Sequence, residues 1–292
     1  MERAVSAPSD GTGHSSAHQW FGDWQNQGHA ALFDSRAGLS DRMLRIQMEA
    51  FNDVRLLREW LDPARAVRLL EVGCATGEFY RYLRGNLPRV EYWGMDISRP
   101  AIARAREKYS RGRFFECDER QILRDNLRRL APDLTPEVLY SKDVLHHQTD
   151  PWGFLRQLLE VPSEALILRT RTRDAGATVL DPQLSCQRHY QGWMPYLVLN
   201  LEELAERIRA AAPAAEIAVL RHRMVLGGRE NRFLPKECYE PETGTAETAV
   251  GVFLKSGRPG TLSVTDRVDS NPSYPLTERI RAAAARRAGG RP

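Results

Sequence analysis

The residues best suited to chemistry follow a short apolar segment near position 70. In LLEVGCATG (69–77), an apolar strand ends in Glu71, and a turn containing Gly73 and Gly77 opens into a helix. Glycines let the backbone approach a ligand closely, and open α/β sheets bind ligands at the carboxyl ends of their strands. The spacing is not the G-x-G-x-x-G of nicotinamide-binding folds. Taken alone, the segment also fits a tight strand-to-helix turn without a ligand.

Two further predicted strands end in acids. Asp96 follows the strand predicted over 90–95 and lies about 20 positions after Gly77, a spacing at which a carboxylate can accept both hydroxyls of a ribose. Asp118 follows the third predicted strand, where an adenine amino group could be bound. Asp96 could instead cap a helix, but three strand ends with suitable chemistry in order favour a nucleoside-like cofactor.

These motifs resemble the class I S-adenosylmethionine-dependent methyltransferases, clearly over residues 65–170 and more loosely over 171–255. LLEVGCATGEF is similar to the family's first motif, with Ala75 where a middle glycine is usual. The resemblance implies S-adenosyl-L-methionine as cofactor, with ribose at Asp96, adenine packed against Ile97 and its amino group at Asp118. The cofactor-binding residues it implies are Glu71, Gly73, Cys74, Ala75, Gly77, Asp96, Ile97, Asp118, Glu119 and Ser141.

A histidine pair follows the fourth predicted strand. SKDVLHHQTDP (141–151) is similar to the xVLHHxxDP segment of small-molecule methyltransferases of the ubiquinone/menaquinone-biosynthesis type. If this segment is helical, Asp143, His146 and His147 share one face and form the predicted catalytic set. A histidine can remove a hydroxyl proton near neutral pH, and we favour His146 because Asp143 could orient its ring. A structural histidine and a three-ligand metal site are the alternatives; we predict no metal.

The acceptor side is predicted from two later segments. Arg169, Arg171 and Arg173 alternate, so they share one face of an extended chain, either as an anion clamp or as a solvated edge with local ion pairs. The connection 172–199 is either a lid over the acceptor pocket or a loop folded over the core. Trp20, Phe21 and Trp24 could close the other side of the cofactor or pack an N-terminal helix. The predicted substrate-binding residues are Arg171, His189, Tyr190 and Trp193.

The apolar spacing defines the elements that must position these residues. Five strands alternate with helices, which predicts an α/β fold with a doubly wound, mostly parallel sheet and helices on both faces. Two later strands form an antiparallel C-terminal hairpin, and Asn200 caps the helix before them. Apolar residues spaced by three and four predict one amphipathic helix over 39–61. The predicted strands are 67–72, 90–95, 114–117, 138–140, 165–168, 217–225 and 249–254.

The chain divides into four predicted parts. Residues 1–18 are a disordered N-terminus, 19–64 an N-terminal helical cap, 65–257 the catalytic domain, and 258–292 a flexible basic tail rich in Gly, Pro and Ser at its start.

Composition narrows the class of protein. The 292 residues include 42% hydrophobic residues and carry a formal net charge of +4, typical of a globular chain. The basic residues are dispersed, which argues against a nucleic-acid partner, and no apolar run reaches membrane-helix length. The N-terminus lacks the apolar core of a signal peptide. Four cysteines without a CxxC pair predict reduced thiols in a cytoplasmic protein.

The function expected from the sequence is methyl transfer from S-adenosylmethionine to a small-molecule acceptor. O-methylation of a sugar or specialised metabolite is the first choice. The alternatives are methylation of RNA or protein, and a non-catalytic cofactor-binding scaffold. The sequence leaves the oligomeric state and the methylated atom open.

Overall fold

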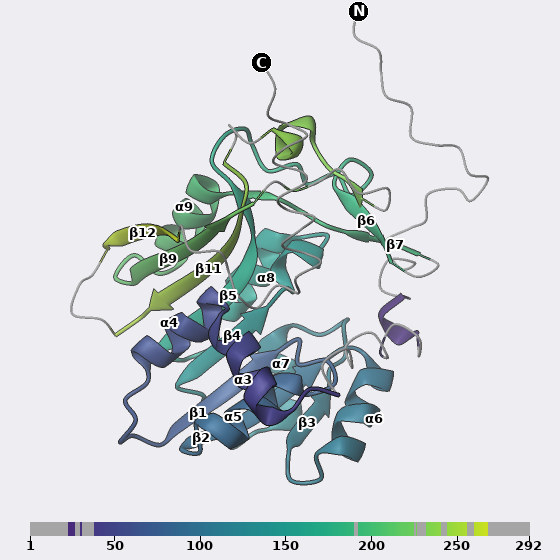
Figure 1. The fold of residues 1–292 in the computed structure, drawn as a ribbon, viewed down its shortest axis with the longest axis vertical. Helices are drawn as coiled ribbons and strands as arrows, with labels where there is room; N and C mark the ends of the chain where they lie inside the picture. Colours follow the sequence, from purple (N-terminus) through teal and green to yellow (C-terminus); the bar gives the residue numbers. More distant parts are fainter. Residues whose placement is uncertain are drawn as a thin grey trace, which may run out of the picture.

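A nine-stranded sheet flanked by helices forms the body of the computed structural model (Figure 1). The structure describes residues 23–26, 30, 38–189, 192–224, 226, 232–240, 244–255 and 260–267. The strands are β1 (Val67–Val72), β2 (Val90–Asp96), β3 (Arg113–Glu116), β4 (Val138–Lys142), β5 (Ala165–Arg173), β6 (Cys186–His189), β7 (Gly192–Pro195), β8 (Leu199–Asn200), β9 (Glu216–Arg223), β10 (Arg232–Phe233), β11 (Ala246–Phe253) and β12 (Leu262–Arg267).

The helices precede or connect these strands, as alternating apolar segments require. Asn200 caps α9 by accepting from the Glu203 backbone N–H at 3.0 Å, as predicted. The helical segments are η1 (Asp23–Gln25), α3 (Asp41–Glu49), α4 (Asn52–Trp60), α5 (Glu78–Asn86), α6 (Arg99–Lys108), α7 (Leu123–Leu130), η2 (Leu145–His147), α8 (Pro151–Leu159), α9 (Leu201–Ala211) and η3 (Lys236–Tyr239).

The strand order confirms the predicted doubly wound fold. The main sheet runs β12-β9-β11-β5-β4-β1-β2-β3, with β8 also paired to β5. Within this sheet β11 alone is antiparallel to its neighbours, and its pairing with β9 is the predicted hairpin. The chain reverses direction across the sheet between β1 and β4, which are paired in parallel. Such a switch point is where open α/β sheets bind ligands.

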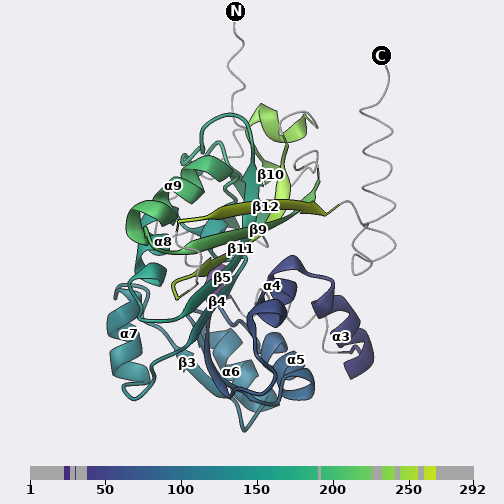
Figure 2. The ribbon, with the colours of Figure 1, turned by 90° about the vertical axis from the view of Figure 1, so that its left-hand side faces the viewer.

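Alternation along the strands divides the core into two layers. Leu69 of β1 packs in a cluster with residues of α3 to α6, whereas its neighbour Leu70 packs in a cluster with residues of α7, α8 and α9. Figure 2 shows the sheet between these two groups of helices. Because both faces are covered, the central strands are apolar on both sides.

The prediction of one helix over 39–61 is wrong, because the structure has two helices there, α3 and α4. Phe51 at the break is extended and buried. Its ring lies 4.0 Å from Lys142 Nζ and 4.3 Å from Arg169 Cζ. The helix therefore breaks at Phe51, where the ring contacts cationic side chains from distant strands, although the amphipathic pattern of the sequence continues through this residue.

The start of the predicted flexible tail is a strand instead. β12 pairs in parallel with β9, with Val264 opposite Val219. Its sequence, LSVTDR, is short and polar and has no apolar pattern that would predict a strand. The strand forms because the segment pairs with the edge of the sheet. Residues 268–292 and the predicted disordered N-terminus lie outside the described residues.

The predicted lid segment contains a second sheet. β6 and β7 form an antiparallel hairpin, and β10 pairs with β6 to complete the order β10-β6-β7. We call this the small sheet. It lies beyond the upper end of β5 in Figure 1.

Candidate active site

The glycine-rich loop after β1 has a conformation that only a few residue types adopt easily. Gly73 and Gly77 have φ of 86° and 80°, and Ala75 has φ of 46°. A Cβ at Gly73 would lie 2.2 Å from Val144 Cγ2, so glycine is needed where this loop passes the segment after β4. The loop therefore brings its backbone close to the histidine segment.

Asp96 at the end of β2 fixes this loop. One carboxylate oxygen accepts from the Ala75 backbone N–H at 2.8 Å, and the other accepts from the Ser98 backbone N–H at 2.8 Å. The following residues hold η1, because the Gln25 side chain donates to the Ile97 carbonyl at 2.7 Å. Asp96 thus links the glycine-rich loop to the residues after β2, and those residues in turn contact η1.

Asp118 after β3 is positioned by α7. Asn126 accepts from the Asp118 backbone N–H at 2.9 Å and donates to the Asp118 carbonyl at 2.8 Å. These paired bonds hold the backbone of Asp118 in place. Asn126 was not among the predicted residues.

Glu71 has its carboxyl group buried beside the loop. Tyr92 donates a hydrogen bond of 2.5 Å to it. Burial raises the pKa of Glu71 to about 8, although the Tyr92 hydrogen bond acts in the opposite direction. At neutral pH this side chain therefore keeps its proton until a cation comes close.

A cavity of about 700 Å³ opens along these strand ends. That volume is in the range of small-molecule sites. All three predicted catalytic residues and Arg171 line it. The predicted cofactor-binding residues that line it are Glu71, Gly73, Cys74, Ala75, Asp96, Ile97, Asp118 and Glu119.

Two predicted cofactor residues do not line this cavity. A Cβ at Gly77 would lie 2.8 Å from the Phe114 ring, so this glycine permits packing at the start of α5. Ser141 is buried in β4, and its hydroxyl has no hydrogen-bond partner among the residues that the structure describes. Its neighbour Lys142 lines the cavity instead, since successive side chains of a strand point to opposite faces.

The two histidines differ in burial and in partners. His146 is buried, and burial, followed by the neighbouring His147, lowers its pKa well below the ordinary value. His147 is half-buried, and its Nδ1 lies 2.7 Å from the Pro195 carbonyl oxygen. Because a carbonyl only accepts, Nδ1 carries the hydrogen, and Nε2 of the neutral ring is the acceptor nitrogen.

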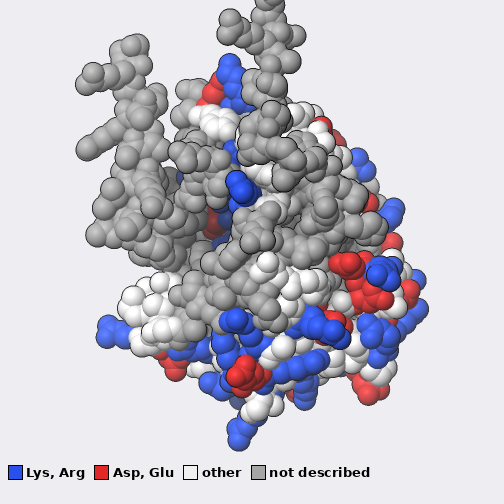
Figure 3. All heavy atoms as spheres, turned by 90° about the vertical axis from the view of Figure 1, so that its right-hand side faces the viewer, with Lys and Arg blue, Asp and Glu red and all other residues white. Residues whose placement is uncertain are grey.

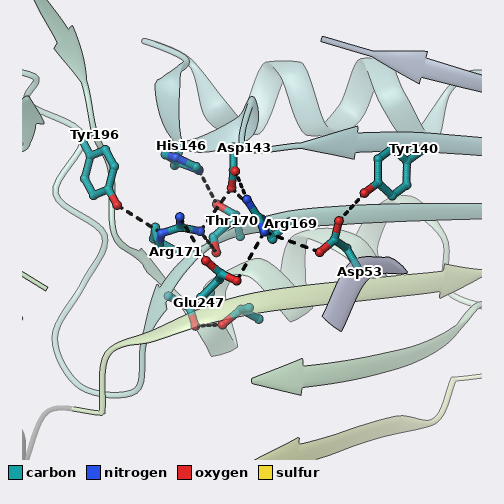
Figure 4. A network of polar contacts seen from close by, with 11 residues as sticks. Asp53, Tyr140, Asp143, His146, Arg169, Thr170, Arg171, Tyr196 and Glu247 are labelled. Atoms are coloured by element: carbon teal, nitrogen blue, oxygen red, sulfur yellow. Dashed lines mark hydrogen bonds and ion pairs between the residues drawn. The ribbon is translucent and has the colours of Figure 1, made fainter. Parts of the chain in front are cut away.

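Asp143 contacts arginines rather than orienting a histidine. Its carboxylate accepts from Arg169 Nε at 2.9 Å and from Arg171 Nη1 at 3.2 Å (Figure 4). Burial acts to raise its pKa, but the two guanidinium groups outweigh burial and hold the pKa well below its usual range. The segment is not one α-helix either, since Asp143 has φ of 58° and only residues 145–147 form a 3-10 turn.

The alternating arginines are buried or nearly so and form ion pairs, so they are not a solvated edge. Arg169 lies between Asp143, Glu247 and Asp53, and Arg171 pairs with Asp143 and Glu247 (Figure 4). Arg173 pairs with Glu237 at 3.5 Å. We call Asp53, Asp143, Arg169, Arg171 and Glu247 the ion-pair network.

The network reaches the acceptor side through Tyr196. Arg171 Nε donates to the Tyr196 hydroxyl at 3.1 Å, and the Tyr196 ring lies 5.1 Å from the His146 ring. On the other side, Tyr140 bonds to Asp53 of α4. No local pattern predicts Asp53, Tyr196 or Glu247 as partners, because they come from three distant elements.

The residues of the predicted lid segment that line the cavity differ from those predicted to bind the substrate. Trp193 packs against Phe233, with ring centroids 5.0 Å apart, and does not line the cavity. The side chain of His189 and all of Tyr190 lie outside the described part of the chain, as do Trp20 and Phe21. Trp24 lines the cavity with its ring edge-on to His147 at 5.6 Å. The later residues that line it are Gln187, Arg188, Tyr196 and Arg232.

Two other site types were tested against the described residues. Within them, no group of three or more His, Cys, Asp or Glu side chains is arranged to hold a metal ion, so Asp143, His146 and His147 do not form such a group. No helix in the same residues has the length and apolar character needed to cross a membrane.

Comparison with known proteins gives a family-model match over part of the chain. Residues 70–162 match the family model described as a methyltransferase domain. No curated protein sequence matches the chain.

Solved structures with similar folds have low sequence identity. The N-terminal domain of EvdMO1 with SAH bound is 15% identical, with a TM-score of 0.46 over 69% of this chain and 81% of that chain. A SAM-dependent methyltransferase from Aquifex aeolicus is 14% identical, with a TM-score of 0.46 over 78% of this chain and 98% of that chain. The CurJ carbon methyltransferase is 19% identical, with a TM-score of 0.44 over 72% of this chain and 54% of that chain.

The described residues form a doubly wound α/β fold with a cavity at the switch point of its sheet, where folds of this class bind ligands. The family-model match covers that switch point, from β1 to the end of α8. Residues 70–162 therefore match a methyltransferase domain, and they lie on a doubly wound α/β fold.

Proposed function

We propose that this protein methylates a hydroxyl group of a small molecule, a sugar or specialised metabolite, with His147 as the general base. One observation carries the proposal: His147 lines the same cavity as the glycine-rich loop, and the Pro195 carbonyl fixes its Nδ1–H. A base held by a backbone carbonyl presents Nε2 in one orientation. The similarity of the His146-His147 segment to small-molecule methyltransferases supports the same acceptor class.

The residues at the strand ends suit the cofactor. The carboxyl group of Glu71 is buried, with its pKa raised to about 8 by burial, so a nearby ammonium group would stabilise its ionised form. We assign the ribose hydroxyls to Asp96, the adenine amino group to Asp118, and the adenine face to Ile97. When bound, S-adenosylmethionine supplies a methyl group already activated by its sulfonium sulfur.

The protein's own contribution is alignment and proton removal. His147 Nε2 takes the hydroxyl proton as the acceptor oxygen forms its bond to the methyl carbon, and the electron pair of the broken C–S bond stays on sulfur. Trp24 and Tyr196 flank His147 and limit the approach of water. Proximity and orientation supply most of the rate, and the base supplies the rest.

The surface favours a small acceptor over a nucleic acid. Figure 3 shows Lys and Arg gathered over the lower part of one face, with Asp and Glu among them. Arg99 pairs with Glu116, and Arg113 pairs with Glu91. A nucleic-acid site is expected to show a more concentrated basic patch. The four free cysteines support a cytoplasmic, reducing location.

The test has two stages. Calorimetry should show binding of S-adenosylmethionine and S-adenosylhomocysteine and no binding of nicotinamide dinucleotides. Incubation with methyl-labelled cofactor and a cell extract should then label a small molecule. Label recovered only in RNA or protein would refute the acceptor class, and absence of cofactor binding would refute the function itself.

A further inference from the structure

The short helix η1 is attached to the segment that follows β2. Gln25 Nε2 donates to the Ile97 carbonyl at 2.7 Å, and Gln25 Oε1 accepts from the Arg99 backbone N–H at 3.2 Å. The Ser98 hydroxyl donates to the Trp24 carbonyl at 2.5 Å. Three consecutive residues after β2 therefore hold two consecutive residues of η1.

The side chain of Trp24 contacts two other parts of the molecule. Its ring lies edge-on to the His147 ring, with ring centroids 5.6 Å apart, and it lines the cavity. The same ring packs against Cys186 and Met194 of the small sheet. In Figure 1, η1 is the short purple element between β7 and α6. The backbone of Trp24 is thus fixed after β2, and its ring is fixed by the small sheet and by the segment after β4.

These contacts of Trp24 lie on opposite sides of β1. In the main sheet β1 lies between β4 and β2 and pairs in parallel with both. Neighbouring strands are about 4.8 Å apart, so the carboxyl ends of β2 and β4 are separated by roughly 10 Å. Trp24 bridges this separation, and the glycine-rich loop leaves β1 between its two ends. Helix η1 therefore spans the cavity over the loop that is proposed to contact the cofactor.

The attachment of η1 is suited to reversible movement. The helix is a single turn, and the side chain of Gln25, which carries two of its hydrogen bonds, is exposed. Elements held by few buried contacts and by exposed hydrogen bonds open at low free-energy cost. A methyltransferase must also release its spent cofactor in every turnover, and such release steps commonly require a covering element to move.

From this arrangement we propose that η1 is a strap that holds the cofactor in the cavity, with Trp24 as a cofactor-positioning residue, and that the strap moves whenever the cofactor enters or leaves. The inference rests on the proposed function, because it names how the cofactor is retained at that site. An S-adenosyl compound bound by Asp96 and Ile97 lies between the glycine-rich loop and Trp24. The strap therefore controls the rate of cofactor exchange.

The test measures the two rate constants of S-adenosylhomocysteine binding to the full chain, after calorimetry has established that it binds. Association of the tritium-labelled compound is followed by rapid filtration, and release is followed after addition of excess unlabelled compound. Trp24→Ala should speed release at least about tenfold, the scale of losing one well-packed aromatic contact. It should also speed association, because the open form no longer has to be populated before binding.

Matched variants separate a strap from an ordinary wall of the cavity. Loss of a wall contact speeds release alone, and a damaged site slows association. Gln25→Ala keeps the Trp24 ring but removes the bonds to residues 97 and 99, so it should raise both rate constants by a smaller factor than Trp24→Ala. Gln183→Ala, at an exposed position that does not line the cavity, should leave both unchanged. Trp24→Phe should restore part of the effect of Trp24→Ala.

Two results would overturn the inference while leaving the proposed function intact. One is a folded Trp24→Ala protein whose association rate constant is unchanged or lower. The other is a Gln25→Ala protein whose two rate constants equal those of Gln183→Ala, and this comparison decides alone if Trp24→Ala does not fold. If the wild-type protein does not bind S-adenosylhomocysteine, the proposed function fails, and this inference fails with it.

Discussion

The two ends of the cavity are built in different ways. At the cofactor end, residues from one stretch of the chain, between Glu71 and Asp118, meet because adjacent parallel strands end side by side. Backbone groups dominate there, as in the bond from Ala75 N–H to Asp96. At the acceptor end, the contacts are side-chain pairs between distant segments, such as Arg169 with Glu247.

The difference affects how each end responds to substitution. A loop held by its own backbone conformation tolerates changes of side chain except where φ is positive or space is absent, as at Gly73. A network of buried charges depends on every member, since removing one partner leaves an uncompensated charge. Substitutions at the acceptor end should therefore have larger effects than substitutions at the cofactor end.

The largest expected effect is at His147. His147→Ala should lower turnover by about 10²–10⁴, the usual contribution of a general base, with cofactor affinity almost unchanged. The acidic limb of the pH–rate profile, where the base becomes protonated, should disappear in this variant. Steady-state kinetics with labelled cofactor would measure both.

His146 provides the control for that experiment. Burial holds the pKa of His146 well below the ordinary value, so it stays neutral and is not the titrating base. A His146→Gln variant should keep the acidic limb. If this variant loses the limb and His147→Ala keeps it, the assignment of the base is reversed.

The next effect is on stability at the acceptor end. Arg169→Met removes the cation beside Asp143 and beside the buried Asp53 and Glu247, and should cost about 3–5 kcal/mol of unfolding free energy. The exposed pair of Arg55 with Glu59 offers a control, and Arg55→Gln should change stability by less than about 0.5 kcal/mol. Urea denaturation of both variants measures the contrast. Equal effects would show that the network is not a buried charge cluster in solution.

Substitutions at the cofactor end should lower the affinity for the cofactor rather than the stability of the fold. Asp96→Ala should weaken binding of S-adenosylmethionine by about 1.5–3 kcal/mol, the range for hydrogen bonds to a charged group. Asp125→Ala, at an exposed position of α7, should leave calorimetric affinity unchanged. An unchanged affinity in Asp96→Ala would remove the ribose assignment.

The last prediction is a pH dependence of stability at the cofactor end. Burial raises the pKa of Glu71 from 4.5 to about 8, so the folded protein binds this proton more tightly than the unfolded chain does. The Glu71 contribution to stability is therefore present at low pH and is lost as pH rises toward 8. The slope is at most about 1.4 kcal/mol per pH unit.

Denaturation of cofactor-free protein between pH 5 and pH 8 would measure this slope. Glu71→Gln, which keeps a hydrogen-bonding group without the titration, should flatten it. If Glu71→Gln keeps the wild-type slope, titratable groups other than Glu71 cause the pH dependence.

The sequence determined much of the cofactor end. Strand alternation, the glycine-rich loop and the acids after three strands are local patterns, and parallel strands bring their carboxyl ends to one edge of the sheet. Sequence reasoning could not separate Gly77 from Gly73, because its role is a close contact with Phe114 that no local pattern contains. The same limit applies to Ser141, which points to the other face of β4 from Lys142.

The acceptor end was decided by tertiary structure. The sequence supplied the alternation of Arg169, Arg171 and Arg173, but their partners Glu247 and Glu237 lie more than sixty positions away. Our proposal of His147 rather than His146 as the base depends on Pro195, whose carbonyl lies beside His147 through the β6–β7 hairpin. Local patterns encode which backbone conformation a segment adopts, whereas burial and charge pairing depend on which distant segments pack together.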